Sequence, residues 1–203
     1  MNRPTTKKGC ETRERIMVSA ARLFARQGAR GTSIDEILSE SGTGKSQFYH
    51  YFSDKDELIR CVHAMQIERM LALHSVIFEQ LDSWEGFELL QDTVLHLLES
   101  QRFQNGCPIG SLASELAASD ELVRIDTEQY FDRKKAAIVR GLTSMKLRGE
   151  LRADTDVQGL ADFVVTVLQG AKLMCKVRRS ADSASASFRH MMAYLRSHRT
   201  ALA

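Results

Sequence analysis

The sequence predicts an all-α fold, and three observations lead to that prediction. Proline occurs twice in 203 residues, at Pro4 and Pro108, where average usage gives roughly ten. Aromatic residues make up 7% of the chain, and no run alternates β-branched or aromatic residues with polar ones as a strand does. Helix start signals recur along the chain instead. Because proline disrupts helices and strands alike, its scarcity alone does not decide, and the other two observations carry the prediction.

Five helices are predicted in the first half of the chain, at residues 11–27, 34–40, 45–51, 54–81 and 83–101. The first has its apolar residues on one stripe and ends at Gly28. Ser33 and Glu36 have the spacing of a capping box, which opens the second helix, and Gly42 ends it. Serine and aspartate residues stand at the expected starts of the fourth and fifth helices.

Four more helices are predicted at residues 108–118, 119–148, 156–179 and 188–198, with a loop at 180–185. Pro108 stands at the first position, which a helix favours for proline, and Gly149 follows the longest of the four. The helix at 156–179 is apolar nearly all round, so it must be buried on both sides. A dimer interface or the interior of a monomer would bury it equally well.

Basic residues gather at the N-terminal end of the chain. Residues 1–30 contain eight Lys and Arg against two Glu, a net charge of +6, although the whole chain carries only +2. A basic end on a nearly neutral body suggests an anionic partner such as nucleic acid. A disordered, solvated basic tail over residues 1–10 is the alternative explanation of the same charge.

The sequence predicts a cytoplasmic protein without a membrane partner. Its N-terminus is polar and basic, and its most apolar stretch, Phe163–Cys175, is interrupted by polar residues and falls short of the about 20 residues that a membrane span needs. The cysteines at positions 10, 61, 107 and 175 have no metal-ligand spacing. We therefore expect reduced thiols, no metal and no cofactor.

The segment from residue 33 to residue 55 has the pattern of a helix-turn-helix. Two short helices are joined by Ser41–Gly44, the turn length of this motif. The second helix is expected to enter the DNA major groove with its outward residues while Phe48 packs inside. The predicted DNA-binding residues read bases or hold phosphates, and they are Thr32, Ser33, Thr43, Lys45, Ser46, Gln47, Tyr49, His50 and Lys55.

A phosphate-binding P-loop is the rival interpretation of Gly44-Lys45-Ser46. That motif requires a glycine at position 39, which is Ser39 here, and a buried strand before the loop. The preceding residues have a helical capping box instead. No acid–base pair, triad or metal cluster appears either, so we predict that the protein is not an enzyme and has no catalytic residue.

The run from Thr32 through Leu58 resembles the DNA-binding domain of the tetracycline-repressor (TetR) family, with its Lys-x-x-x-Tyr-His-x-Phe core beginning at Lys45. Ser46 and Gln47 depart from the residues common in the family, which bears on the operator sequence. The resemblance implies a homodimer with a helix-turn-helix DNA-binding domain at 11–55 and a ligand-binding and dimerisation domain at 56–203. It also implies double-stranded operator DNA and a small-molecule inducer as partners.

The resemblance further implies that the last two helices of each subunit form a four-helix bundle in the dimer. The predicted dimerisation residues are apolar and spaced along these helices, and they are Val164, Leu168, Ala171, Phe188, Met191, Met192 and Leu195. The ligand site is expected among the central helices. Its predicted residues are Met65, Phe103, Cys107, Leu112, Tyr130, Phe163 and Met174. Alternatively, each of these is an ordinary core residue that contacts no ligand.

Cys107 belongs to a segment, Asn105–Leu116, that resembles the branch of the family containing acrylate- and electrophile-responsive repressors. The residue directly precedes the helix that Pro108 opens, and a helix N-terminus favours a thiolate. The sequence thus predicts a repressor that leaves a near-palindromic operator when a small molecule binds or modifies its C-terminal domain. One alternative is a thiol-based electrophile or redox sensor acting through Cys107, although a buried, inert cysteine is the simpler explanation of that residue. A small-molecule enzyme that uses the helical pocket is the other alternative function.

Overall fold

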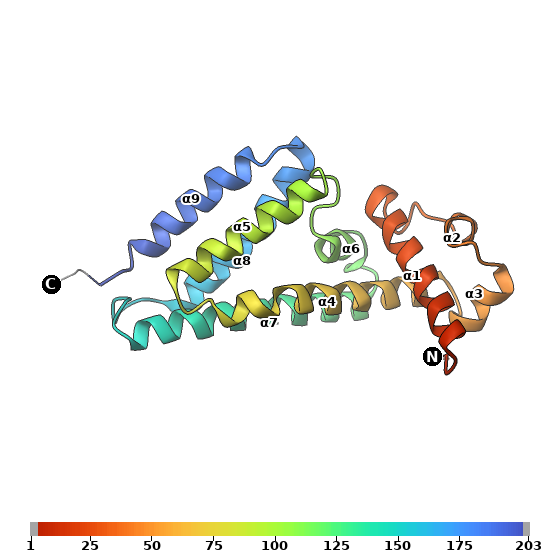
Figure 1. Cartoon of the computed structure of the whole chain (residues 1–203), viewed down its shortest axis with the longest axis horizontal. Helices are drawn as coiled ribbons and strands as arrows, with labels where there is room; N and C mark the ends of the chain where they lie inside the picture. The colour runs from red at the N-terminus through yellow and green to blue at the C-terminus, as the bar shows by residue number, and fades with distance from the viewer. Residues whose placement is uncertain (1–3, 201–203) are drawn as a thin grey trace. The chain divides into compact units, whose positions relative to one another are not determined.

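The computed structural model describes residues 4–200, and over these residues the chain is helical (Figure 1). Its helices in chain order are α1 (Lys7–Gln27), α2 (Ile34–Ser41), α3 (Lys45–Tyr51), α4 (Lys55–Glu79), α5 (Trp84–Ser100), α6 (Pro108–Leu116), α7 (Glu121–Leu147), α8 (Val157–Arg178) and α9 (Asp182–Arg196). The extended structure in the described residues is one isolated antiparallel bridge, between Leu151 and Arg199. None of the described helices is long and apolar enough to cross a membrane. The all-α prediction is confirmed.

The chain divides into two compact units. The first contains the described residues up to Arg69 together with Pro108–Thr127, and the second contains Met70–Cys107 and the described residues from Glu128 onward. The first unit therefore extends beyond the predicted boundary at residue 55. It does so because Leu112 and Leu116 of α6 are buried in the same core as α1 and the start of α4.

In the first unit, α1 packs against α2, α3 and α6 (Figure 1). Its buried residues face a core that includes Phe48 and Phe52. α1 begins four residues before the predicted start, because the hydroxyl of Thr6 caps it by accepting the backbone N–H of Gly9 at 3.2 Å. Residues 7–10 of the expected disordered tail therefore belong to α1. Residues 1–3 of that tail lie outside the described residues.

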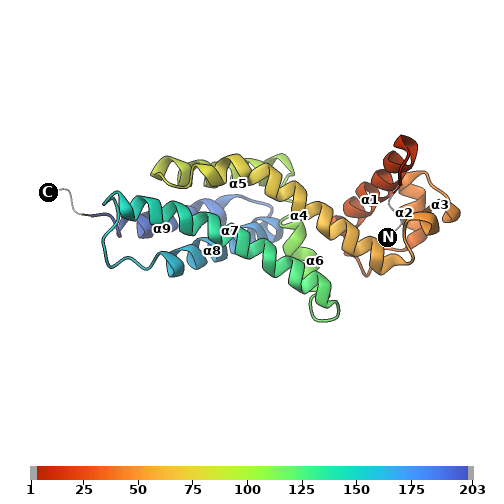
Figure 2. The same cartoon turned by 90° about the horizontal axis from the view of Figure 1, so that it is seen from below.

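In the second unit, α9 lies along α8 and also contacts α5 (Figures 1 and 2). α9 begins at Asp182, so the loop predicted at 180–185 is wrong for most of its length. The small residues of that stretch permit a helix, and two further observations explain why one forms. Ala184 is buried in the core, and Asp182 places a negative charge in the first turn.

The predicted dimerisation residues form the core of the second unit instead. Each of them is buried within the chain itself, and the set is Val164, Leu168, Ala171, Phe188, Met191, Met192 and Leu195. A side chain already covered by its own chain has no surface left for a second subunit. The periodicity located the inward face of α8 and α9 correctly, but the assignment of that face to a dimer contact is wrong.

Candidate DNA-binding surface and ligand site

α3 presents one apolar face to the core of the first unit and a polar face outward. Phe48 is 0% exposed and its ring lies 5.5 Å from that of Phe52, while the neighbouring Tyr49 is 55% exposed. Lys45, Ser46, Gln47 and His50 are also exposed. This division is the one that the helix-turn-helix pattern predicts for a helix that reads the major groove.

The turn before α3 depends on two glycines. Gly42 ends α2 with a φ of 62°, in the left-handed region where side chains other than glycine are strained. Gly44 caps α3, and its backbone N–H donates to Oε1 of Gln47 at 3.1 Å. Gln47 therefore holds the helix start with its oxygen, and its Nε2 remains as the donor toward a base.

Two of the predicted phosphate ligands have partners within the first unit. Lys45 forms an exposed ion pair with Asp35 at 3.1 Å, and Lys55 donates to the carbonyl of Arg30 at 3.2 Å. An exposed ion pair contributes about 0–1 kcal/mol. DNA phosphates can therefore replace Asp35 at small cost.

Thr32 corrects the predicted DNA-binding set. Its side chain is 1% exposed, and its hydroxyl donates to the carbonyl of Gly28 at 2.7 Å. It therefore stabilises the turn before α2 and has no free surface for a phosphate. Thr43 is half-buried, and its hydroxyl is hydrogen-bonded to that of Ser41 at 2.7 Å.

The N-terminus of α2 has the predicted capping box. The side chain of Ser33 accepts the N–H of Glu36, and the Glu36 carboxylate accepts the backbone N–H of Ser33 at 2.7 Å. This backbone hydrogen bond, with further ones from Gln27 and the Ser33 hydroxyl, lowers the pKa of Glu36 to about 2. The carboxylate stays ionised and occupies part of the helix end that was predicted to hold a phosphate.

The turn between α1 and α2 is held by a residue of α6. The Glu115 carboxylate accepts the backbone N–H of Ala29 at 2.9 Å and that of Arg30 at 2.5 Å. The guanidinium of Arg30 in turn donates to the Ser119 hydroxyl at 3.0 Å. Within the first unit, α6 is thus fastened to the helix-turn-helix by charge-assisted hydrogen bonds.

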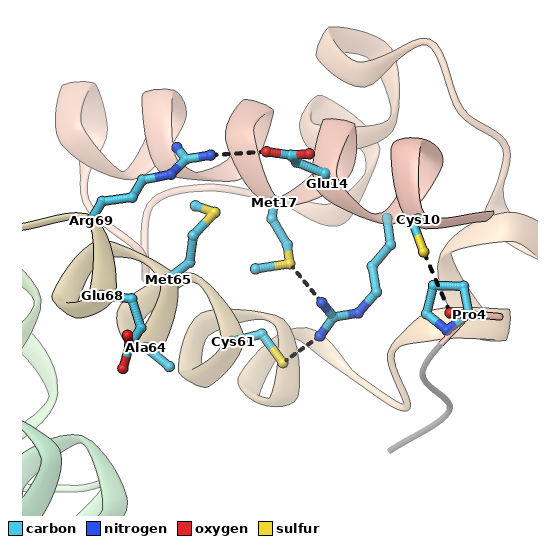
Figure 3. A pocket seen from close by; sticks show the side chains of 10 residues that line it. Pro4, Cys10, Glu14, Met17, Cys61, Ala64, Met65, Glu68 and Arg69 are labelled. Atoms are coloured by element: carbon cyan, nitrogen blue, oxygen red, sulfur yellow. Dashed lines mark hydrogen bonds and ion pairs between the residues drawn. The ribbon is translucent and has the colours of Figure 1, made fainter. Parts of the chain in front are cut away.

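A groove of about 520 Å³ lies between α1 and the start of α4 (Figure 3). Arg13 crosses it, donating to Sδ of Met17 at 3.1 Å and to Sγ of Cys61 at 3.2 Å. Burial raises the pKa of Cys61. Met65 lines this groove, so the structure places this predicted ligand residue in the first unit.

The other predicted ligand residues are divided between the units. Leu112 is buried in the core of the first unit, whereas Phe163 lies in a groove of about 520 Å³ beside α8 and α9, 5.3 Å from the ring of Tyr194. Met174 is half-buried on α8. Phe103, Cys107 and Tyr130 belong to the second unit. Two of the predicted ligand residues thus belong to the first unit and five to the second.

Cys107 is half-buried and forms no disulfide. It lies close enough to Tyr130, Lys134 and Lys172 to interact electrostatically with each. The thiol-sensor alternative stays a prediction. The two lysines beside it, and His74, were not predicted as site residues. One signal could have revealed Lys172, since it interrupts the most apolar stretch of the sequence.

Two family models match the chain. The model "Bacterial regulatory proteins, tetR family" covers residues 16–62, and "Tetracyclin repressor-like, C-terminal domain" covers residues 67–191. An uncharacterised HTH-type transcriptional regulator of Mycobacterium tuberculosis is 31% identical over 82% of this chain and 85% of its own length. Another, from Lactococcus lactis, is 29% identical over 87% of this chain and 89% of its own length.

The solved structures agree on the fold. A TetR transcriptional regulator from Chloroflexus aurantiacus superimposes with a TM-score of 0.82 at 23% identity, covering 96% of this chain and 98% of that one. The helix-turn-helix matches the first family model, and the second model spans most of the remaining helices. The chain therefore belongs to the TetR family of helix-turn-helix transcriptional regulators.

Proposed function

We propose that the protein is a homodimeric repressor that leaves a near-palindromic operator when a small molecule binds its second unit. The observation that carries this proposal is the exposed polar face of α3 beside a buried Phe48. Two such helices in a dimer are expected about one DNA turn apart, roughly 34–36 Å. A ligand that favours another spacing would release the operator. It can shift the equilibrium between the two spacings by no more than the difference in its affinity for the two states.

Binding to the DNA that flanks the protein's own gene tests the proposal. We expect a sequence-specific complex whose affinity falls steeply with salt, because phosphate contacts release counterions. The Lys45→Ala variant should weaken binding to all sequences alike and reduce the salt slope by about 1. The matched variant Asp35→Asn removes the partner of Lys45 and should strengthen binding. Absence of any salt-sensitive, specific complex in gel-shift experiments would refute a DNA-binding role.

The outer face of α8 and α9 is the surface that we propose for dimerisation. Leu173, Val177 and Tyr194 are each at least half exposed, and apolar side chains that gather on one surface mark interaction sites. They replace the buried residues that the sequence suggested. A second copy of the chain is the proposed occupant, because TetR regulators act as dimers and these two helices leave apolar residues uncovered.

The Leu173→Glu/Val177→Glu double variant is expected to be a monomer, because it places two charges at the centre of the proposed interface. Light scattering coupled to gel filtration would measure the mass. Leu147→Glu is the control, since Leu147 is 83% exposed on α7 and lies outside α8 and α9. A dimer that survives the double variant, or one that Leu147→Glu disrupts equally, would contradict this interface.

A further inference from the structure

Four polar side chains from three helices are buried inside the second unit. They are His74 of α4, Tyr130 and Lys134 of α7, and Lys172 of α8, with exposures of 1%, 1%, 2% and 3%. Tyr130 and Lys134 are four residues apart on α7 and so lie on one face of that helix. We refer to these four residues as the buried basic cluster.

The buried basic cluster lacks the partners that buried polar groups normally have. Neither ring nitrogen of His74 has a hydrogen bond, and the Tyr130 hydroxyl has none. Lys134 and Lys172 are 2% and 3% exposed, so their ammonium groups are largely removed from water. Nζ of Lys134 lies over the Tyr130 ring, 5.6 Å from its centroid. Lysine is almost never fully buried without a pairing group.

The charges in the buried basic cluster are mutually unfavourable. Burial, and then the charge of Lys172, lower the pKa of Lys134 to about 7. Burial also lowers the pKa of Lys172, and burial together with both lysines lowers the pKa of His74 to about 3. The one other ionisable group that acts on these lysines is Cys107. Within residues 4–200, no carboxylate is among the groups that shift the pKa of Lys134, Lys172 or His74.

A purely structural role does not explain such an arrangement. Apolar side chains of similar volume would stabilise the same core better, because a buried charge without a partner is costly. The groups also share one chemical property. Each lysine offers N–H donors and no acceptor, and a tyrosine hydroxyl and a neutral imidazole each add one donor. Converging donors and positive charge are what an anion requires.

We propose that the buried basic cluster binds the carboxylate of a small organic acid, with Lys134 and Lys172 as its charged ligands and Tyr130 and His74 as further donors. The acid has an apolar body, because the surrounding core is apolar and the ring of Phe78 lies 5.5 Å from that of His74. The claim that such an acid is the inducer rests on the proposed function. The claim that the buried basic cluster binds an acid does not.

Thermal melting of the full chain with benzoate and hexanoate, against benzamide and hexanamide, tests this inference. The acids are expected to raise the melting temperature and the neutral amides of the same shape are not. Lys134→Met and Lys172→Met should each weaken acid binding roughly tenfold or more, because each removes a hydrogen bond between charged groups. Tyr130→Phe, which deletes only a hydroxyl, should weaken it less.

Lys135→Met is the matched control. Lys135 is the next residue of α7, but it pairs with Asp162 at 2.7 Å on the surface, so its loss should leave acid binding unchanged. Equal responses to acids and amides, no response to either acid, or full acid binding by both lysine variants would overturn the inference.

Operator binding, measured on the same proteins, separates this inference from the proposed function. A chain that binds DNA but no acid keeps the proposed function and loses the inference. A chain that binds acids through Lys134 and Lys172 but binds no DNA keeps the inference and loses the proposed function.

Discussion

The Phe48→Ala variant is expected to lower the free energy of unfolding of the first unit by about 3–5 kcal/mol, the usual cost of truncating a buried phenylalanine. The ring is fully buried and contacts Phe52 in the core that holds α3 against α1. Chemical denaturation followed by circular dichroism would measure the loss. Because domains have about 5–15 kcal/mol in total, this loss is a large share of the stability, and we expect DNA binding to weaken with it.

Tyr49→Ala is the control for this prediction, since Tyr49 is the next residue on α3 and its ring packs against that of Phe48 from the outside, with the centroids 5.2 Å apart. Tyr49 is more than half exposed, so its truncation should change stability by less than about 1 kcal/mol. The operator complex should nevertheless weaken strongly. Equal destabilisation by both substitutions, or an intact operator complex in Tyr49→Ala, would show that α3 does not present the face described above.

Local sequence signals were sufficient where a helix is decided by its own ends. The prediction of a helix over residues 45–51 is confirmed residue by residue, and the capping box at Ser33 is present. The starts of α1 and α9 were missed for different reasons. Thr6 was not recognised as a cap, and residues 182–187 form a helix whose Ala184 is buried in the core. Tertiary burial overrides weak local propensity, and a single sequence does not reveal it.

The candidate sites also differ in how far local sequence signals predict them. The DNA-binding residues follow one another along α3, so helical periodicity alone separates Phe48 from its exposed neighbours. Periodicity also found the apolar stripe of α8 and α9, but it does not say whether the same chain or a second one covers that stripe. The buried basic cluster joins residues about a hundred positions apart along the chain, and no spacing rule predicts that His74 and Lys172 share one interior.

Lys134 is expected to make stability depend on pH in a defined direction. Its folded pKa of about 7 lies below its ordinary value of 10.5, so between these values the unfolded chain holds a proton that the folded chain has released. The free energy of unfolding therefore rises with pH from about 7 to about 10. The groups that face Lys134 are Lys172, Cys107, His74 and Tyr130, and among them only the Lys172 charge acts to lower its pKa further.

Lys134→Met removes this titration, so the variant should be more stable than the wild type at pH 7, and the difference should shrink toward pH 10. The gap is on the order of a few kcal/mol, because one unit of pKa corresponds to about 1.4 kcal/mol. Denaturation at a series of pH values would measure it, with Lys135→Met following the wild-type curve. Parallel curves for the wild type and Lys134→Met would mean that Lys134 has an ordinary pKa and therefore a partner or solvent. A gap that closes when benzoate is added would instead connect the cost of the buried charge directly to the ligand that relieves it.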